Sequence, residues 1–433
     1  MARNTDKQIR NKVIYQIFTR NYKDGTFQAV ESDLERIKAL GVDIIYLLPI
    51  HPSGAVRRKG TCGSPYAIKD YRAIDPAQGT MEDFIHLTQA VHAAGMKVML
   101  DVVYNHTSPD SWLAGNHPEW FFHKADGSFG NRIGDWWDVI DLDYSNTDLW
   151  DYQIETLKMW AKHVDGFRCD VAPLVPLEFW KRAKDEVETV RPGCLWLAES
   201  VEPAFITGCR KDGIPAWSDS ELYQVFDICY DYDTYSYLER TQRGDCSLSE
   251  YLERVNQQEA IYPDNYSKLR CLENHDRPRA ATMAPDQTVL RNWTAWTYFV
   301  KGTTMIYTGE EYCATHHPTL FDHDPVSFDS DKDISSFIAK LGEIKKSPAF
   351  AYSTFSSKAI GQDNDVILAL HEVNADAPIK QQTVMGIFST TGRKQALKID
   401  LPDGYYTNAI TGESIDVFEK TILYSGEPII LFL

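Results

Sequence analysis

The stretch Asp165-Gly-Phe-Arg-Cys-Asp-Val171 is a short apolar run that ends in a carboxylate, and two further stretches repeat this arrangement. They are Cys194-Leu-Trp-Leu-Ala-Glu-Ser200 and Leu269-Arg-Cys-Leu-Glu-Asn-His-Asp276. Apolar runs of this length are typical of parallel strands buried on both faces. In a barrel of alternating strands and helices, the carboxyl ends of the strands converge on one mouth. We therefore expect Asp170, Glu199 and Asp276 to surround one ligand.

The rest of the chain alternates short β-branched or aromatic runs with longer segments of helical period. This alternation is the signature of βα units. Helical spacing is clearest from Met81 to Ala94 and from Trp150 to Val164. The predicted strands begin near Val13, Ile44, Lys97, Asp165, Cys194, Leu222, Lys268 and Thr303. Eight such units predict an α/β protein built on a (β/α)8 TIM barrel.

Two segments depart from the βα alternation. Residues 107–146 are rich in Gly, Pro, Asn, Asp and aromatic residues and lack a helical period, which predicts a small irregular excursion domain after the third strand. Residues 348–433 contain short alternating strands with turn signals, which predicts a C-terminal antiparallel β-sandwich domain. The catalytic barrel then comprises residues 1–106 and 147–347.

The composition is that of an ordinary globular protein, with 43% hydrophobic and 24% charged residues. The polar residues 1–10 lack the apolar stretch of a secretory signal, so we expect a cytoplasmic protein. A net charge of −18 repels phosphate backbones and anionic lipids, which argues against nucleic-acid and membrane partners and favours a neutral ligand. The cysteines form no Cys-x-x-Cys pair, and we expect them to be reduced. The sequence is compatible with a monomer or a small homo-oligomer.

Polar side chains follow the predicted strands. Asn105 and His106 end the third strand and, taken alone, fit a capped strand end as well as a binding site. Arg168 lies two residues before Asp170, so both side chains point to one side of the strand and the guanidinium can keep the carboxylate ionised. Glu199 has no cation within four residues, and an apolar environment would raise its pKa and suit it to act as a general acid.

Residues 273–279 concentrate ionisable side chains and an amide after an apolar run. This segment is too polar for a core and too concentrated for an ordinary βα turn. Each of these segments also fits a structural ion pair or an exposed strand end. Their joint placement after strands 3, 4, 5 and 7 favours a single active site at the mouth of the barrel.

These four segments resemble the sequence regions of the α-amylase family of retaining α-glucan hydrolases and transglycosylases. The resemblance covers about residues 10–345. It continues in three further stretches: Gly41-Val-Asp-Ile-Ile-Tyr-Leu-Leu-Pro49, Gly63-Ser-Pro-Tyr66 and Ile306-Tyr-Thr-Gly-Glu-Glu311. It implies that Asp170 is the nucleophile, Glu199 the acid/base, and Asp276 the carboxylate that stabilises the distorted sugar. The substrate-binding residues that it implies are Tyr66, His106, Arg168 and His275.

The resemblance implies no obligatory cofactor. Many members of the family hold a calcium ion between the barrel and the excursion, which implies Asn105 as one ligand and Asp135 or Asp138 as another. The chain departs from the family after the nucleophile, where Pro173 and Leu174 stand in place of a frequent Lys-His pair. This departure affects the side of the site where an acceptor would bind.

We predict a retaining glycoside hydrolase that cleaves α-1,4-glucosidic bonds of maltooligosaccharides or starch-like α-glucans through a covalent glycosyl-enzyme. The nearest alternative is a 4-α-glucanotransferase or another α-glucosidic transferase. An alternative of another class is a non-catalytic relative that binds carbohydrate or partners a transporter. That alternative predicts the loss of one of the three acids, and all three are present. The short excursion also favours an open cleft.

Overall fold

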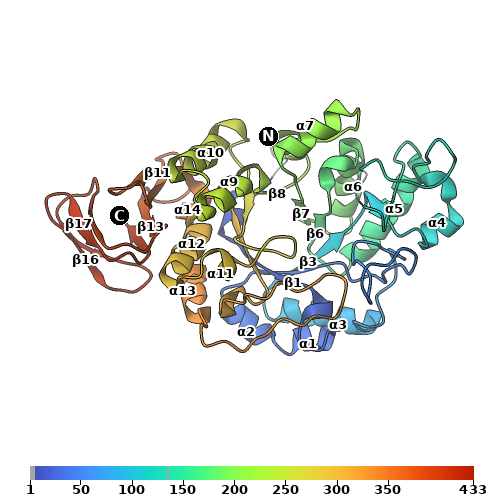
Figure 1. Ribbon diagram of the computed structural model, residues 1–433, viewed down its shortest axis with the longest axis horizontal. Helices are drawn as coiled ribbons and strands as arrows, with labels where there is room; N and C mark the ends of the chain where they lie inside the picture. The colour runs from blue at the N-terminus through green and yellow to red at the C-terminus, as the bar shows by residue number, and fades with distance from the viewer. Residues whose placement is uncertain (1–4, 134–135) are drawn as a thin grey trace.

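The computed structural model describes residues 5–133 and 136–433. Within these residues, eight parallel strands close into a barrel in the order β1-β10-β9-β8-β7-β6-β3-β2 (Figure 1). The strands are β1 (Val13–Ile17), β2 (Ile44–Leu47), β3 (Lys97–Val102), β6 (Gly166–Cys169), β7 (Leu195–Ala198), β8 (Ile228–Tyr230), β9 (Lys268–Arg270) and β10 (Thr303–Tyr307). Most strand residues are buried because helices cover the outer face and side chains fill the interior. The predicted (β/α)8 barrel is confirmed.

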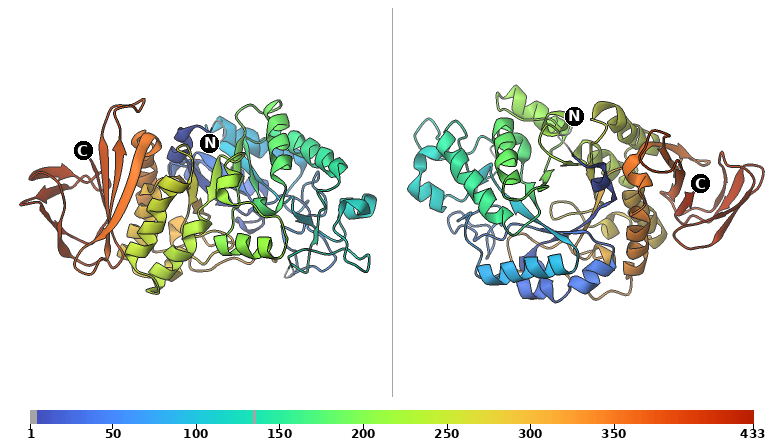
Figure 2. Two further views of the ribbon diagram at one scale, coloured as in Figure 1. Left: turned by 90° about the horizontal axis from the view of Figure 1, so that it is seen from above. Right: turned by 180° about the vertical axis from the view of Figure 1, so that it is seen from behind.

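Helices surround the barrel (Figures 1 and 2). Two lie where the periodicity predicts them: α3 (Met81–Ala93), whose first turn is fixed by a capping box of Thr80 and Asp83, and α5 (Thr147–Ala161), which is capped by Asn146. The other helices outside the excursion are α1 (Phe27–Glu31), α2 (Leu34–Ala39), α6 (Leu177–Glu188), α7 (Pro203–Lys211), α8 (Asp219–Leu222), α9 (Tyr232–Arg243), α10 (Leu248–Ile261), α11 (Ala280–Met283), α12 (Gln287–Phe299), α13 (Ser335–Lys345) and α14 (Ala349–Tyr352).

The strand predicted near Leu222 begins later, at Ile228 in β8. Leu222 instead ends the short helix α8. The cause is a capping box, in which the Ser218 side chain bonds the backbone of Glu221 while the Glu221 side chain bonds the backbone of Ser218. This local signal outweighs the apolar character of the run that follows.

The excursion leaves the barrel after β3 and contains β4 (His106–Thr107), α4 (Trp112–Asn116) and β5 (Ile140–Asp141). Strands β4 and β5 pair antiparallel, with His106 opposite Asp141. The excursion lies beside α5, at the end of the molecule away from the C-terminal domain (Figure 1). Since β4 follows β3 closely, His106 stays near the carboxyl end of the barrel.

The C-terminal domain is an antiparallel β-domain, as predicted, and lies against α12 and α13 (Figure 1). Its main sheet has the order β11-β12-β13-β18, and two ribbons, β14–β17 and β15–β16, cover the outer face. Ile367 and Phe388 join the large hydrophobic core that also contains helix α12, where Phe388 packs on Phe299, whereas Leu368 and Ile387 join a separate core under the ribbons. The strands are β11 (Ser353–Ile360), β12 (Val366–Val373), β13 (Thr383–Ser389), β14 (Gln395–Lys398), β15 (Gly404–Thr407), β16 (Ser414–Val417), β17 (Thr421–Tyr424) and β18 (Ile429–Phe432).

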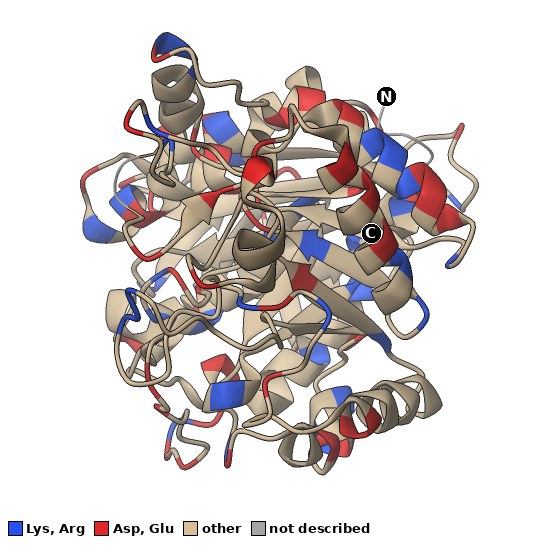
Figure 3. Cartoon of the chain, turned by 90° about the vertical axis from the view of Figure 1, so that its right-hand side faces the viewer, with Lys and Arg blue, Asp and Glu red and all other residues tan. Residues whose placement is uncertain are grey.

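Acidic and basic residues are interspersed over the face shown in Figure 3. No helix in the described part of the chain is long and apolar enough to cross a bilayer. All eight cysteines carry free thiols, and most of them are buried.

Candidate active site

The carboxyl ends of β6, β7 and β9 bring the three predicted acids to one mouth of the barrel. Asp170 and Glu199 directly follow β6 and β7. Arg168 joins them, because its Nη1 lies 2.7 Å from Asp170 Oδ1 and its Nη2 lies 2.9 Å from Glu199 Oε1. Asp276 is linked through His275, whose Nε2 lies 3.1 Å from Asp276 Oδ2. The predicted acids and Arg168 therefore form one connected cluster.

Asp101 is a further carboxylate of this cluster that the sequence did not indicate. The parallel register of β3 and β6 sets Asp101 directly beside Arg168, whose Nη1 lies 2.9 Å from Asp101 Oδ1. The hydroxyls of Tyr46 and Tyr66 donate to Asp101 Oδ2 at 2.7 and 3.1 Å. Burial raises the pKa of Asp101 to about 6, although Arg168 opposes this shift. One guanidinium is thus shared by three carboxylates.

The two oxygens of Asp170 have different surroundings. Oδ1 accepts a hydrogen bond from Arg168, whereas Oδ2 is buried and has no hydrogen-bond partner among the described residues. His106 Nε2 lies 3.8 Å from Oδ2. Burial and the charge of Glu199 raise the pKa of Asp170 well above its usual range, and Arg168 lowers it. Arg168 serves three carboxylates at once, so it lowers the pKa of Asp170 by less than burial and Glu199 raise it, and its role in keeping Asp170 ionised stays a prediction.

Glu199 does not have the apolar environment that its sequence neighbours predict. One oxygen is ion-paired with Arg168, and the other accepts a 2.8 Å hydrogen bond from the backbone N–H of Val171. Val171 has φ 41° and ψ 43°, a left-handed conformation that is strained for a β-branched residue. The prediction failed because the cation comes from the neighbouring strand β6 and not from the sequence around Glu199. The strained turn and Arg168 together fix the direction of the Glu199 carboxyl group.

His106 and His275 are neutral in this site, because burial lowers their pKa to about 4 and about 3. Asn105 Nδ2 donates to His106 Nδ1, and Gln16 Nε2 donates to His275 Nδ1. Each ring therefore carries its proton on Nε2, which points toward Asp170 in one case and Asp276 in the other. His106 can therefore donate a hydrogen bond to a hydroxyl group bound between the acids, whereas the Nε2–H of His275 already donates to the hydroxyl of Tyr66.

Tyr66 lies partly exposed at the same mouth. Its ring stacks on that of His275, with centroids 5.6 Å apart and an angle of 17° between the planes. The Tyr66 hydroxyl lies 2.6 Å from His275 Nε2 and donates to Asp101. Tyr66 thus connects the Asp101–Arg168 pair to His275 and leaves part of its ring open to a ligand.

Asn105 and Asp141 line one cavity of about 400 Å³ between the excursion and the barrel. Asp141 Oδ1 is buried and has no hydrogen-bond partner among the described residues, so it fits an oxygen ligand of a hard cation. Asp138 is instead ion-paired with Lys59 at 2.7 Å, and Asp135 lies outside the described residues. In residues 5–133 and 136–433, no group of three or more His, Cys, Asp or Glu side chains could hold a metal ion. Asp141 is therefore a better partner for Asn105 than Asp138.

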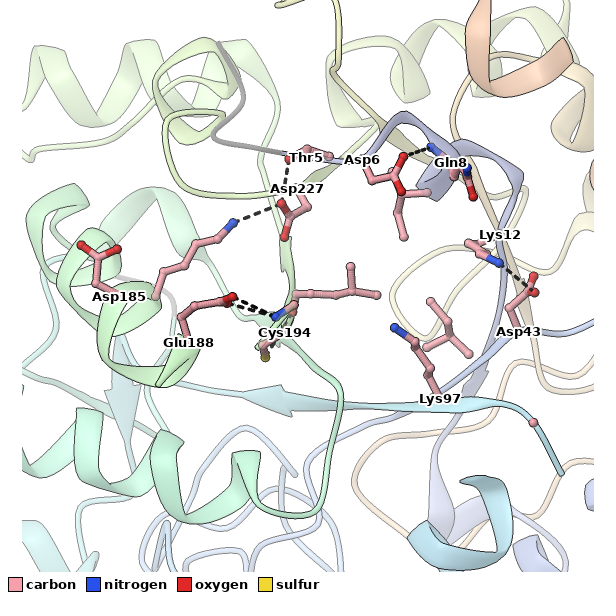
Figure 4. Close-up of a pocket in the computed structure, with 16 residues that line it drawn as sticks. Thr5, Asp6, Gln8, Lys12, Asp43, Lys97, Asp185, Glu188, Cys194 and Asp227 are labelled. Atoms are coloured by element: carbon pink, nitrogen blue, oxygen red, sulfur yellow. Dashed lines mark hydrogen bonds and ion pairs between the residues drawn. The ribbon is translucent and has the colours of Figure 1, made fainter. Parts of the chain in front are cut away.

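A second cavity, of about 510 Å³, lies at the amino ends of the strands, away from the candidate site (Figure 4). Its charged side chains are largely paired with one another, as in the Lys184–Asp227 and Lys12–Asp43 pairs. In βα barrels the active site lies at the carboxyl ends of the strands, and residues at the amino ends serve stability. We therefore assign no catalytic role to this cavity.

The fold and the cluster at its mouth are those of barrel enzymes that act on glycosidic bonds. Comparison with protein families makes the assignment specific. The alpha-amylase catalytic domain matches residues 5–365, and the bacterial alpha-amylase C-terminal domain matches residues 358–431. The chain belongs to the alpha-amylase family.

Two solved structures match over nearly the whole chain. An alpha-amylase from Lactobacillus plantarum is 43% identical, with a TM-score of 0.95, over 99% of this chain and 100% of that one. A noncanonic maltogenic alpha-amylase, AmyB from Thermotoga neapolitana, is 32% identical, with a TM-score of 0.86, over 98% and 99% of the two chains.

Some named relatives are longer proteins. The alpha-1,4-glucan:maltose-1-phosphate maltosyltransferase of Myxococcus xanthus is 32% identical over 270 residues, which are 56% of this chain and 38% of that protein. Alpha-amylase 2 of Dictyoglomus thermophilum is 26% identical over 367 residues, 78% of this chain and 61% of that protein. The chain spans less than two thirds of the length of either relative.

Proposed function

We propose that the protein is a retaining glycoside hydrolase that cleaves α-1,4-glucosidic bonds in malto-oligosaccharides and related α-glucans. The observation that carries this proposal is the asymmetry of Asp170. Arg168 holds one oxygen, while the other is buried at the mouth and has no hydrogen-bond partner in the part of the chain that the structure describes. A carboxylate that attacks an anomeric carbon needs one oxygen fixed and one free.

Arg168 also favours retention over inversion. Because its two terminal nitrogens hold Asp170 and Glu199 at 2.7 and 2.9 Å, the carboxylates lie side by side on one guanidinium. Retaining enzymes use a spacing of about 5–5.5 Å, whereas inverting enzymes need about 6.5–9.5 Å to admit a water molecule between acid and base. An arrangement on one guanidinium supports the shorter spacing.

The proposed reaction has two steps. Asp170 Oδ2 attacks the anomeric carbon while Glu199 gives its proton to the departing glycosidic oxygen, so a glycosyl ester forms and the glycosidic bond breaks. Glu199 then takes a proton from water, the hydroxide attacks the same carbon, and Asp170 leaves as a carboxylate. Burial raises the pKa of Asp101 to about 6 and that of Asp170 well above its usual range, so the cluster favours a bound proton.

The remaining side chains would position the sugar. His106 carries an Nε2–H group that can donate to a sugar hydroxyl, and His275 holds the Tyr66 hydroxyl beside the bound sugar. The exposed part of the Tyr66 ring can pack against the apolar face of the pyranose. The Asp276 side chain is 44% exposed and lies 3.1 Å from His275 Nε2, so it can accept hydrogen bonds from sugar hydroxyls without competing for the anomeric carbon.

Transfer to a second sugar is the competing function, since one relative is named a maltosyltransferase and Pro173 and Leu174 alter the acceptor side. The whole-length similarity to two proteins named alpha-amylases favours hydrolysis. Incubation with maltotriose distinguishes the two. We expect glucose and maltose with the α-anomer released first, as seen by proton NMR. Longer oligosaccharides without new reducing ends would establish transfer, and a β-anomer would exclude retention.

We also propose that Asn105 and Asp141 can ligate calcium, which would stiffen the contact between the excursion and the barrel. Two side-chain oxygens fall short of the about six to eight that calcium prefers, so backbone carbonyls and water would supply the others. Calcium should raise the melting temperature of the wild type and have a smaller effect on Asp141→Ala. An equal rise in both proteins would remove Asp141 from the site.

A further inference from the structure

Three loops meet at the side of the barrel mouth that lies opposite Glu199. In the order β1-β10-β9-β8-β7-β6-β3-β2, strand β7, which carries Glu199, faces β1 across the barrel. The strands that flank β1 are β2 and β10. The loop after β2 contains residues 57–63, which we call the bridging loop. It contacts both the excursion and the loop after β10.

The bridging loop is tied to the excursion by an ion pair. Lys59 Nζ lies 2.7 Å from Asp138, whose side chain is only 6% exposed, and 5.3 Å from the centre of the Trp137 ring. Arg57 Nη1 donates to the backbone carbonyl of Trp137 at 3.3 Å. Because Asp138 is almost completely buried, loss of Lys59 would leave a buried carboxylate without its cation, which costs more than the loss of an ordinary surface pair.

The bridging loop is also tied to residues 319–322 after β10. The N–H of Cys62 donates to the carbonyl of Phe321 at 2.9 Å, and the N–H and hydroxyl of Thr61 both donate to Asp322 Oδ1, at 2.8 and 2.7 Å. Lys59 Nζ lies 5.5 Å from the centre of the Phe321 ring. Gly60 approaches so closely that an added Cβ would lie 2.5 Å from the Phe321 carbonyl oxygen. The two loops are therefore in direct contact.

The bridging loop and the two segments that it contacts, residues 136–138 and 319–322, are called the wall below. The wall borders the sugar-binding part of the candidate site. The ring of Trp136 packs on that of His106, with centroids 5.4 Å apart. The charges of Asp138 and Lys59 lie close enough to His106 to influence its pKa in opposite directions. The wall thus begins directly beside a residue proposed to hold the sugar that is attacked.

The orientation of the substrate follows from the role of Glu199. The departing part of the chain must lie toward Glu199, which protonates its oxygen. The opposite, non-reducing end of the attacked sugar then points across the mouth, toward the bridging loop. An α-glucan chain cut at an internal bond must continue in that direction, which is the side of the mouth where the bridging loop lies.

We propose that the bridging loop, joined to residues 136–138 and 319–322, closes the non-reducing side of the site, so that the protein cleaves short units from chain ends and not internal bonds. This proposal rests on the proposed hydrolase function. It replaces the open cleft that the short excursion led us to expect. The cleft is narrowed because the loop after β2 supplies the wall that a longer excursion would otherwise provide.

Two maltoheptaosides test the proposal, one with a free non-reducing end and one whose terminal O4 and O6 are joined as an ethylidene acetal. An enzyme that needs a free end should cleave the first about 100-fold faster than the second, because the blocked end cannot fit beside the wall. Chromatography of early products should show short saccharides released from the free end.

Lys59→Ala should weaken the wall and lower this rate ratio about tenfold by admitting the blocked chain. Phe321→Ala is a second variant that loosens the same contact without removing a charge. Lys420→Ala is the matched control, since Lys420 forms a 2.7 Å pair with Asp400 in the C-terminal domain, and the ratio should not change. Circular dichroism confirms that each variant is folded.

The outcomes separate the two proposals. Cleavage of neither substrate by the wild type would overturn the proposed function. Equal cleavage of both by the wild type would overturn the closed wall while leaving the hydrolase intact. A high ratio that persists in both Lys59→Ala and Phe321→Ala would show that another segment closes the site.

Discussion

The carboxylates at the two ends of the barrel are paired in opposite ways. At the amino end, an aspartate lies just before each of three strands: Asp43 before β2, Asp165 before β6 and Asp227 before β8. Each accepts a hydrogen bond from a backbone N–H near the start of a neighbouring strand, and the donors are Val13, Val98 and Trp196 respectively. Each also has at least one cationic partner of its own, among them Lys12, Arg191 and Lys184. At the carboxyl end, three carboxylates share one guanidinium.

This difference separates structural from chemical roles within one fold. The aspartates at the amino end are fully paired, so they stabilise strand ends and have no oxygen free for chemistry. At the carboxyl end, Asp170 keeps one oxygen that has no hydrogen-bond partner within residues 5–133 and 136–433, in a cluster with excess negative charge, which costs stability. We infer that this loss of stability is retained because the free oxygen of Asp170 takes part in the reaction. Substitutions at the two ends should therefore have opposite consequences.

Asp170→Asn should have the largest effect on activity. The change removes the attacking oxygen, so kcat on malto-oligosaccharides should fall by about 10⁴-fold or more. Because it also removes charge from an overcharged cluster, thermal stability should stay the same or rise. Steady-state kinetics and calorimetry measure both. Near-normal turnover would refute the nucleophile assignment.

Glu199→Gln should reduce activity by about 10²- to 10⁴-fold on malto-oligosaccharides, whose leaving group needs a proton. An activated aryl glycoside, such as a dinitrophenyl maltoside, has a leaving group that departs without protonation. The rate of its glycosylation step should therefore fall far less. The comparison of single-turnover rates on the two substrates checks this. Equal losses on both would argue against the acid role.

Asp227→Ala should leave kcat unchanged but destabilise the fold by about 3 kcal/mol, since Lys184 and the N–H of Trp196 lose their buried partner. Urea denaturation gives the free energy of unfolding, and the Asp170→Asn protein serves as the comparison. If Asp227→Ala instead lowered kcat at unchanged stability, the contrast between the two ends would be wrong.

Asp101→Asn should have the smallest effect, a shift of the pH profile. The Asp101 charge raises the pKa of Asp170, and the nucleophile must be ionised to react. Without that charge Asp170 ionises at lower pH, so the acid limb of kcat/KM should move to lower pH. A limb that moved to higher pH would mean that Asp101 mainly holds Arg168 in place.

The sequence predicted the barrel and the three acids because both follow from short-range patterns. An apolar run followed by a carboxylate predicts a strand and its end, and closure of the barrel brings these strand ends to one mouth. Asp101 could not be predicted as part of the cluster, because its role depends on the register between β3 and β6, which sets it beside Arg168. Glu199 was misjudged for the same reason, since its cation comes from another strand.

Contacts between distant loops could not be predicted either. Lys59 and Asp138 are far apart in the sequence, and neither belongs to a periodic element. Likewise, nothing near Asp141 distinguishes it from the other aspartates of the excursion until β4 and β5 pair. These features depend on tertiary packing, which is also where the specificity of the site resides.

The most direct test of the account is to trap the glycosyl-enzyme. A 5-fluoro-α-glucosyl fluoride slows the second step, so the ester should accumulate and be found by mass spectrometry of proteolytic peptides. We predict one added glycosyl group on the peptide that contains Asp170, and none in the Asp170→Asn protein. A label on any other residue, or turnover with inversion and no label, would contradict the account.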